Sequence, residues 1–326
     1  MQSPIRKQLM DAFTKADGEF LSGQTLAEIA GCSRTAVWKH IEELRKEGFE
    51  FEAVKKRGYR IVKGPDRVSE EEINPELKTR FVGRVIKYIE SVPSTQKIAH
   101  ALAQEGAEEG TTVIADEQTE GRGRLLRSWH SPKGTGIWMS IILKPQLPPQ
   151  RAPQFTLIAA VAVVQAIEEV CGLSPEIKWP NDILLNGRKL TGILTELQAE
   201  ADKINSIIIG IGMNVNQKAE DFPEELQSVA TSLFMEKQEK VSRVKLIQRV
   251  MEKLEIYYDL YMEKGFTPIK LLWESYAISI GRQITARTIT GSIHGKALGI
   301  NEDGVLRIED AEGQVHEVYS ADIELK

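Results

Sequence analysis

Cysteine is nearly missing from this 326-residue chain, which holds only Cys32 and Cys171, and its five histidines are scattered. Two cysteines cannot build a disulfide framework, and no Cys or His pattern has the spacing of a zinc site. We therefore expect no structural metal and a reducing compartment, which is the cytoplasm.

A membrane span and a secretory signal are also lacking. The first residues, MQSPIRKQLMDAF, contain no uninterrupted apolar core. The longest apolar run, residues 155–170, ends in acidic residues and predicts a buried helix. We expect no membrane partner.

The two common phosphate-binding loops are missing as well. There is no GxxxxGK[ST], and the nearest GxGxxG is incomplete because Leu126 occupies its third glycine position. A nucleotide site in this chain must therefore use other groups.

The net charge of −5 is unevenly distributed. Residues 1–63 hold 12 basic against 9 acidic residues, so a mildly basic segment precedes an acidic remainder. This asymmetry indicates where nucleic acid would bind.

Residues 25–48 predict two short helices joined by a turn that contains Gly31. The first starts with a capping box of Thr25 and Glu28, and the second is capped by Ser33. The apolar face of the first helix consists of Leu26, Ile29 and Ala30. The second helix exposes near its start the residues that would meet base edges, Arg34, Thr35, Trp38, Lys39 and His40.

A β-hairpin follows, with a basic tip of Lys55, Lys56 and Arg57 that could meet phosphates. The order of helix, turn, helix and wing favours a winged helix-turn-helix that binds DNA. A winged helix that contacts protein instead is the alternative. One such module reads a half-site, so specific binding implies a dimer.

The periodicity breaks at residues 63–77, which predict a linker. Beyond it, strands and helices alternate irregularly, which indicates an α+β domain around a mixed sheet. Asn186-Gly187 predicts a type I′ turn between two strands, and residues 206–216 predict a central strand. The tail from residue 278 shows short strands with glycine-containing turns and predicts a small β-barrel.

Two unusual segments suggest a ligand site. GRGRLLR (residues 121–127) combines a flexible backbone with three arginines, which suits phosphate or carboxylate oxygens. KWPND (residues 178–182) follows a strand, and Lys189 lies beyond the hairpin turn. The plain alternatives are a solvated basic loop or a nucleic-acid patch for the first segment, and an ordinary strand-ending turn for the second.

Together, GRGRLLRSW, KWPND about sixty residues later, and RKLTGIL resemble biotin protein ligase, and the preceding helix-turn-helix resembles its bifunctional ligase and repressor subclass. The resemblance implies a class II synthetase-like ligase domain and an SH3-like C-terminal domain. The boundaries are then 1–64, 65–277 and 278–326.

The resemblance also implies the chemistry. Biotin is activated with ATP and Mg²⁺ to biotinyl-5′-AMP and transferred to a lysine of biotin carboxyl carrier protein, a subunit of acetyl-CoA carboxylase. Biotinyl-5′-AMP would also be the corepressor that drives homodimerisation on operator DNA. A ligase without DNA binding, a lipoate ligase-like enzyme and a ligand-sensing regulator without catalysis are the rival functions.

Residue roles follow from the matched motifs. The catalytic residues would be Lys189, Arg122 and Lys178. The biotin-binding residues would be Ser94, Thr95, Gln96, Gln118, Arg122, Gly123, Arg124 and Lys189. Arg124, Arg127 and Asn181 would bind the nucleotide, and Asp182 is a weaker candidate for Mg²⁺. Trp129 would support the biotin-binding strand, and the residue that covers the adenine is not identified.

Overall fold

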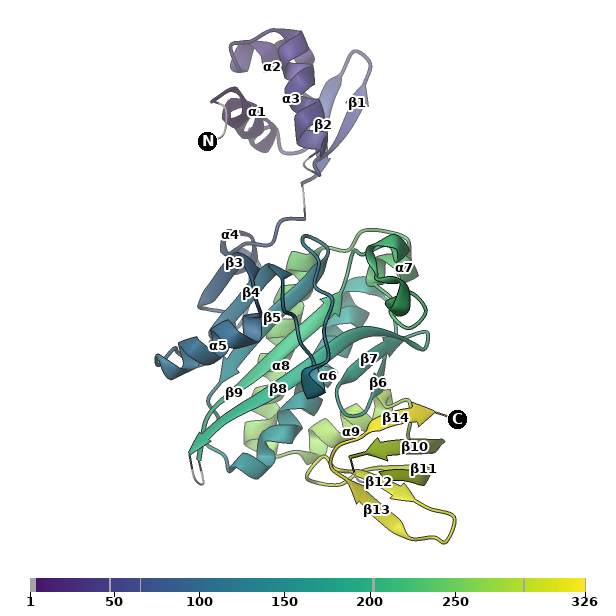
Figure 1. Ribbon diagram of the computed structural model, residues 1–326. Helices are drawn as coiled ribbons and strands as arrows, with labels where there is room; N and C mark the ends of the chain where they lie inside the picture. The colour runs from purple at the N-terminus through teal and green to yellow at the C-terminus, as the bar shows by residue number, and fades with distance from the viewer. Residues whose placement is uncertain (1–3, 47, 65, 201–202, 290, 326) are drawn as a thin grey trace. The chain divides into compact units, whose positions relative to one another are not determined.

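The computed structural model describes residues 4–46, 48–64, 66–200, 203–289 and 291–325. The chain divides into two compact units, Met1–Arg67 and Val68–Lys326, and Figure 1 shows the elements of each. The two units are described in turn.

The first unit is a three-helix module with a hairpin. It contains α1 (Pro4–Lys15), α2 (Gly23–Ile29), α3 (Arg34–Lys46), β1 (Glu50–Val54) and β2 (Gly58–Lys63). The core includes Leu9, Leu26, Val37 and Ile41, none of which is exposed. The strands β1 and β2 pair antiparallel. The predicted winged helix-turn-helix is therefore confirmed.

Two details of α2 differ from the prediction. The helix begins three residues earlier, because the N-cap is Ser22, whose hydroxyl accepts a hydrogen bond from the Thr25 amide at 3.0 Å. Thr25 thus lies inside the first turn and does not cap it. Ile29 is 46% exposed, because Leu26, Ala27 and Ala30 already fill the core face. The predicted cap of α3 is confirmed, since the Ser33 hydroxyl accepts from the Ala36 amide at 3.2 Å.

The second unit is built on a seven-stranded mixed sheet in the order β3-β4-β5-β9-β8-β7-β6. Its strands are β3 (Ile86–Val92), β4 (Thr112–Gln118), β5 (Gly136–Leu143), β6 (Glu176–Lys178), β7 (Asp182–Leu185), β8 (Arg188–Glu200) and β9 (Lys203–Asn214). Among the strand pairs of this sheet within the described residues, only β3 and β4 are parallel. The predicted central strand is β9, and Asn186-Gly187, both at positive φ, joins β7 to β8 as predicted.

Helices cover both faces of this sheet (Figure 1). The helix α5 (Thr95–Gln104) packs on one face, and α6 (Ala152–Cys171) and α8 (Arg243–Lys264) pack on the other. Because side chains of a strand alternate between faces, Ile142 of β5 joins the cluster under α5, and Ile141 joins the cluster with α6 and α8. The helix at Pro149–Cys171 is long and apolar enough to cross a membrane, but 72% of its apolar window is buried, so it is a core helix here.

The remaining elements surround this core. Short helices are α4 (Glu70–Ile73), α7 (Leu233–Lys237) and α9 (Thr267–Tyr276), with 3-10 turns at Asn74–Glu76, Arg124–Leu126, Pro149–Arg151, Ala219–Asp221 and Glu224–Leu226. The tail forms a five-stranded antiparallel sheet in the order β13-β12-β11-β10-β14. Its strands are β10 (Gln283–Thr288), β11 (Gly291–Ile300), β12 (Leu306–Glu309), β13 (Val315–Val318) and β14 (Asp322–Leu325). Its buried residues belong to the same hydrophobic cluster as the large sheet.

Candidate functional site

A cavity of about 490 Å³ opens beside the N-terminal end of α5, over strands β4, β5, β8 and β9. This volume suits a small organic ligand. The lining includes every residue predicted for ligand or metal binding: Ser94, Thr95, Gln96, Gln118, Arg122, Gly123, Arg124, Arg127, Lys178, Asn181, Asp182 and Lys189. The fold thus brings the two motif segments and the start of α5 to one place.

The polar side chains at the start of α5 are held by hydrogen bonds to neighbouring strands. Ser94 occupies the N-cap position, but its side chain makes no capping bond. Instead, Gln118 Oε1 accepts from the Thr95 amide at 2.9 Å and from Thr95 Oγ1 at 3.1 Å. Gln96 is also held at both ends, because its Nε2 donates to two backbone carbonyls and its Oε1 accepts from Ser140 Oγ at 2.8 Å. These amides therefore have fixed orientations beside the cavity.

The loop after β4 places the indole ring of Trp129 against the sheet. Trp129 rests over Gly192 of β8 and Gly212 of β9, and a Cβ at Gly212 would lie 2.4 Å from Trp129 Nε1. Only glycine leaves this space, because that contact is far below van der Waals distance. Trp129 Nε1 is buried and has no hydrogen-bond partner among the described residues. Trp129 therefore both packs on the strands, as expected, and lines the cavity.

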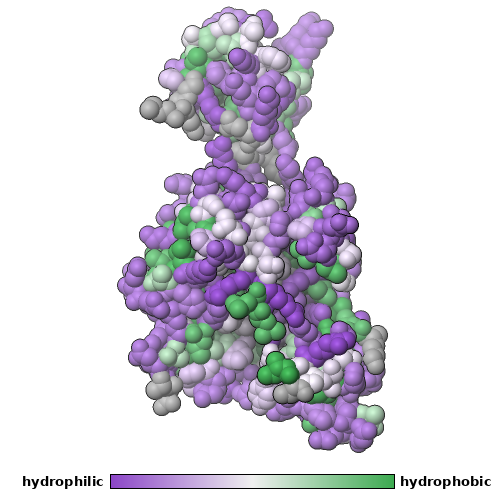
Figure 2. All heavy atoms as spheres, viewed as in Figure 1, coloured by the Kyte–Doolittle hydropathy of each residue, from purple (hydrophilic) through white to green (hydrophobic). Residues whose placement is uncertain are grey.

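The tip of the same loop is exposed and apolar. Leu125 and Leu126 have φ of 54° and 58°, in the left-handed region that favours glycine, and Leu126 is 80% exposed. On the face that Figure 2 shows, hydrophobic residues form small separate groups among hydrophilic ones. The two leucines thus stand out by both conformation and exposure.

Two arginines of the loop contact the C-terminal sheet. Arg124 Nη1 donates to Asn181 Oδ1 at 3.1 Å, and its Nη2 donates to Ser320 Oγ. Arg127 Nη2 pairs with Asp322 Oδ2 at 2.5 Å. Burial lowers the pKa of Arg124, whereas the hydrogen bond from Arg127 lowers the pKa of Asp322. The tail therefore supplies Asp322 to the lining of the cavity.

The lysine and aspartate of the second segment form an ion pair. Lys189 Nζ lies 2.7 Å from Asp182 Oδ1 and 5.4 Å from the centroid of the Trp129 ring. Lys178 reaches the same cavity from the end of β6. A cation that faces both an indole and a carboxylate can turn to a ligand oxygen when one is present.

The segment left open for covering the adenine lies against the cavity. Phe222, Leu226, Val229 and Ala230 line it. This segment is fixed to β8, because the Lys189 amide donates to the Val229 carbonyl at 2.8 Å and the Lys189 carbonyl accepts from Thr231 at 2.9 Å. It supplies apolar side chains, which sequence reasoning did not assign.

Sequence reasoning also missed Glu196, Ser320 and Asp322. Glu196 follows Gly192 and Leu194 at a period of two along β8, so strand alternation could have placed it on the cavity side. Ser320 and Asp322 had no local signal, because their partners lie almost 200 residues earlier in the chain.

The residues predicted for DNA contact belong to the first unit and lie at its surface. Arg34, Thr35 and Lys39 are exposed, Trp38 is 53% exposed, and His40 lies 3.0 Å from Glu43. Lys55, Lys56 and Arg57 form the exposed turn between β1 and β2. The guanidinium carbon of Arg57 lies 4.3 Å from the centroid of the Phe20 ring. One helix and one hairpin tip thus present the predicted basic and aromatic groups.

The Arg127–Asp322 pair predicts a pH effect. The folded-state pKa of Asp322 is lowered, so its contribution to stability is present above the unfolded value, about 3.9, and is lost as pH falls through the folded value. We expect Asp322→Asn to lower the free energy of unfolding at pH 7 by less than about 1 kcal/mol, because the pair is half-exposed. Urea unfolding at pH 7, 5 and 3.5 should show the difference shrinking at the lowest pH. A difference that grows on acidification would contradict the assignment.

The chain thus combines a winged helix-turn-helix unit with an α+β unit whose cavity is lined by a cationic loop. Family models agree by residue range: "HTH domain" matches 6–60, "Biotin/lipoate A/B protein ligase family" matches 88–214, and "Biotin protein ligase C terminal domain" matches 279–326. The chain belongs to the biotin protein ligase family, in its bifunctional ligase/repressor class.

Individual relatives give the same result. The bifunctional ligase/repressor BirA of Bacillus subtilis is 57% identical over the full length of both chains. That of Escherichia coli is 29% identical over 90% of this chain and 89% of its own. The solved biotin protein ligase from Aquifex aeolicus in complex with biotin and ATP is 31% identical, with a TM-score of 0.65, and covers 74% of this chain and 99% of its own.

Proposed function

We propose that this chain is an ATP-dependent ligase that activates biotin as biotinyl-5′-AMP and transfers it to a lysine of biotin carboxyl carrier protein. The single observation that carries this is one cavity lined by both GRGRLLR and KWPND segments, with Lys189 beside them. A biotin carboxylate oxygen attacks the α-phosphorus and pyrophosphate leaves. The carrier lysine amine then attacks the acyl carbon, and AMP leaves.

Both steps concentrate negative charge, which fixed cations stabilise in the transition state. Arg122, Arg124 and Lys189 would hold the carboxylate and α-phosphate, and Lys178 would assist them. Arg127 would reach the outer phosphates after leaving Asp322, and Asn181 would serve the nucleotide. The residues Ser94, Thr95, Gln96, Gln118 and Gly123 would shape the biotin end of the cavity.

Mg²⁺ would accompany ATP and be held mainly by phosphate oxygens, since this ion commonly uses only one or two protein carboxylates. Asp182 is the carboxylate of the KWPND segment that fits this role, and Lys189 now neutralises it. The side chain of Asp182 would therefore have to exchange partners when the nucleotide binds.

Repression would use the first unit. Residues 34, 35 and 38–40 would read base edges, and residues 55–57 would contact phosphates at the operator of biotin-synthesis genes. With biotinyl-5′-AMP bound, the chain would dimerise in the cytoplasm. The exposed Leu125 and Leu126 support this, because apolar side chains at a loop tip suit a protein contact. Domain boundaries at 1–64, 65–277 and 278–326 accompany this proposal.

The decisive test is the intact mass of a purified biotin carboxyl carrier domain after incubation with the protein, ATP, Mg²⁺ and biotin. We expect a gain of one biotin. A parallel tube contains lipoate in place of biotin. A gain with lipoate alone would move the chain to lipoate ligase chemistry, and no gain in either tube would reject ligase activity.

A further inference from the structure

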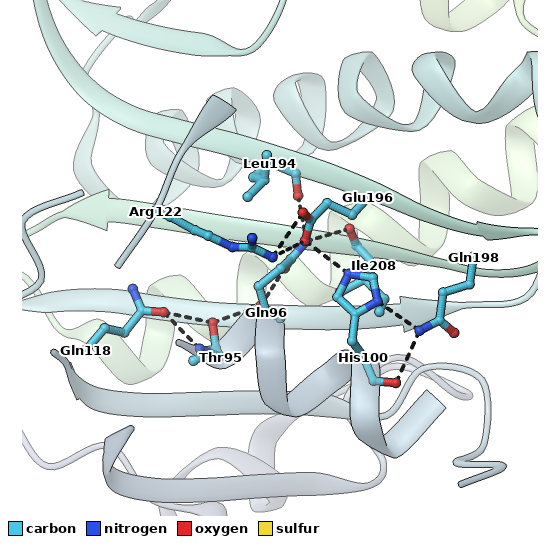
Figure 3. A network of polar contacts seen from close by, with 10 residues as sticks. Thr95, Gln96, His100, Gln118, Arg122, Leu194, Glu196, Gln198 and Ile208 are labelled. Atoms are coloured by element: carbon cyan, nitrogen blue, oxygen red, sulfur yellow. Dashed lines mark hydrogen bonds and ion pairs between the residues drawn. The ribbon is translucent and has the colours of Figure 1, made fainter. Parts of the chain in front are cut away.

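The arginine that begins the loop is held by residues outside it. Arg122 Nη2 donates to both carboxylate oxygens of Glu196, each at 3.0 Å, and Glu196 belongs to β8. His100 of α5 lies with its Nε2 3.0 Å from Glu196 Oε2 (Figure 3). The hydrogen bond with His100 holds the pKa of Glu196 below its ordinary value. A loop, a strand and a helix thus meet at one carboxylate.

The outer end of this network fixes the histidine ring. Gln198 Nε2 lies 2.8 Å from His100 Nδ1 and also donates to the His100 carbonyl at 3.2 Å. Ser206 Oγ donates to Gln198 Oε1 at 2.8 Å, which leaves the amide nitrogen to face the ring. An amide nitrogen only donates, so Nδ1 accepts, and the neutral ring carries its proton on Nε2, toward Glu196.

The inner end of the network faces the cavity. Arg122 lines the cavity, and its Nε is buried without a hydrogen-bond partner among the described residues. Both hydrogen bonds to Glu196 start from Nη2, so Glu196 does not use the other nitrogens of the guanidinium. A ligand oxygen that enters the cavity would meet a guanidinium whose orientation the carboxylate has already set.

We infer that Glu196 is a positioning residue for Arg122, and that His100 positions Glu196, so that the arginine meets the biotin carboxylate already oriented. The inference rests on the proposed function. It assigns part of the loop's substrate affinity to Glu196 of β8 and His100 of α5, two residues that do not line the cavity themselves. A carboxylate suits the task because its two oxygens hold Nη2 of the guanidinium and its charge neutralises the arginine while the cavity is empty.

A purely structural ion pair would behave differently from a positioning one. Its loss would lower the melting temperature, but the folded enzyme would bind biotin as before. A positioning pair changes the KM for biotin, and it does so only while Arg122 is present. Double-mutant cycles separate these cases.

The experiment measures carrier-domain biotinylation at varied biotin and at varied ATP for the full chain. Glu196→Gln keeps the shape but loses the charge, and we expect the KM for biotin to rise about tenfold or more, with kcat within about threefold of wild type. Glu196→Asp, which keeps the charge, should recover part of the affinity. His100→Gln, which keeps a donor, should show a smaller effect than Glu196→Gln. Glu200→Gln, an exposed glutamate on the same strand, is the matched control.

The cycle is completed with Arg122→Ala and the double variant Arg122→Ala/Glu196→Gln. Adding Glu196→Gln to Arg122→Ala should change the KM for biotin less than about twofold, because neighbouring groups in one network are not additive. An unchanged KM in Glu196→Gln, a full effect without Arg122, or a rise in the KM for ATP alone would overturn the inference. Wild-type protein that fails to biotinylate the carrier would instead reject the proposed function.

Discussion

Replacing Lys189 with alanine is expected to lower the rate of biotin transfer about 100- to 1,000-fold, the usual effect of removing one preorganised charge from a transition state. Lys189 Nζ is the cation of the cavity that faces both Asp182 and the Trp129 ring. The loss of Lys189 would also leave Asp182 without its counter-ion, and the unpaired carboxylate would repel the incoming phosphates. Single-turnover formation of biotinyl-5′-AMP, followed by chromatography, measures the step directly.

The matched control is Lys87→Ala, since Lys87 is an exposed lysine of β3 that does not line the cavity. We expect wild-type rates there. If Lys189→Ala formed the adenylate within threefold of the wild-type rate, its catalytic role would be wrong. Similar melting temperatures of the two variants would show that a rate loss is chemical in origin.

The second large effect concerns the wing. With Lys55, Lys56 and Arg57 changed together to alanine, binding to a random-sequence DNA duplex should lose three phosphate contacts. The slope of log affinity against log salt should become shallower by about 2.7, and affinity near 0.15 M salt should fall on the order of a hundredfold. Fluorescence anisotropy across a salt series measures both quantities.

The control removes the same charge from another surface of the unit, by changing Lys7, Lys15 and Lys46 to alanine, which are all exposed. Its salt slope should stay near that of wild type. Equal slopes for the two triple variants would mean that net charge, and not the wing, governs DNA binding. Carrier biotinylation should be unchanged in both.

Most of the fold could be predicted from the sequence, because the signals for helix starts, core faces and turns are local. Ser33, the apolar spacing of Val37 and Ile41, and Asn186-Gly187 each act within a few residues. The start of α2 was predicted three residues too late, because Ser22 and Thr25 can both cap a helix and the local sequence does not choose between them.

The sequence predicted the cavity residues that lie together in short segments, and it did not predict those that only the folded chain brings close. GRGRLLR and KWPND hold their own polar groups, so their residues could be named in advance. Glu196 and Asp322 matter through Arg122 and Arg127, which are distant in sequence. No local pattern encodes such a pairing, because it depends on how the strands and the tail fold together.

Because Trp129 packs over Gly192 and Gly212 beside the cavity, its intrinsic fluorescence can report ligand binding. The chain has five tryptophans, and Trp138, Trp179 and Trp273 are buried, whereas Trp38 belongs to the DNA-binding unit. Trp129 is the one that lines the cavity in the described part of the chain. A ligand that enters the cavity would lie against this indole, so we expect the emission that Trp129→Phe removes to include the part of the spectrum that follows occupancy. Titrations can then be recorded without any attached dye.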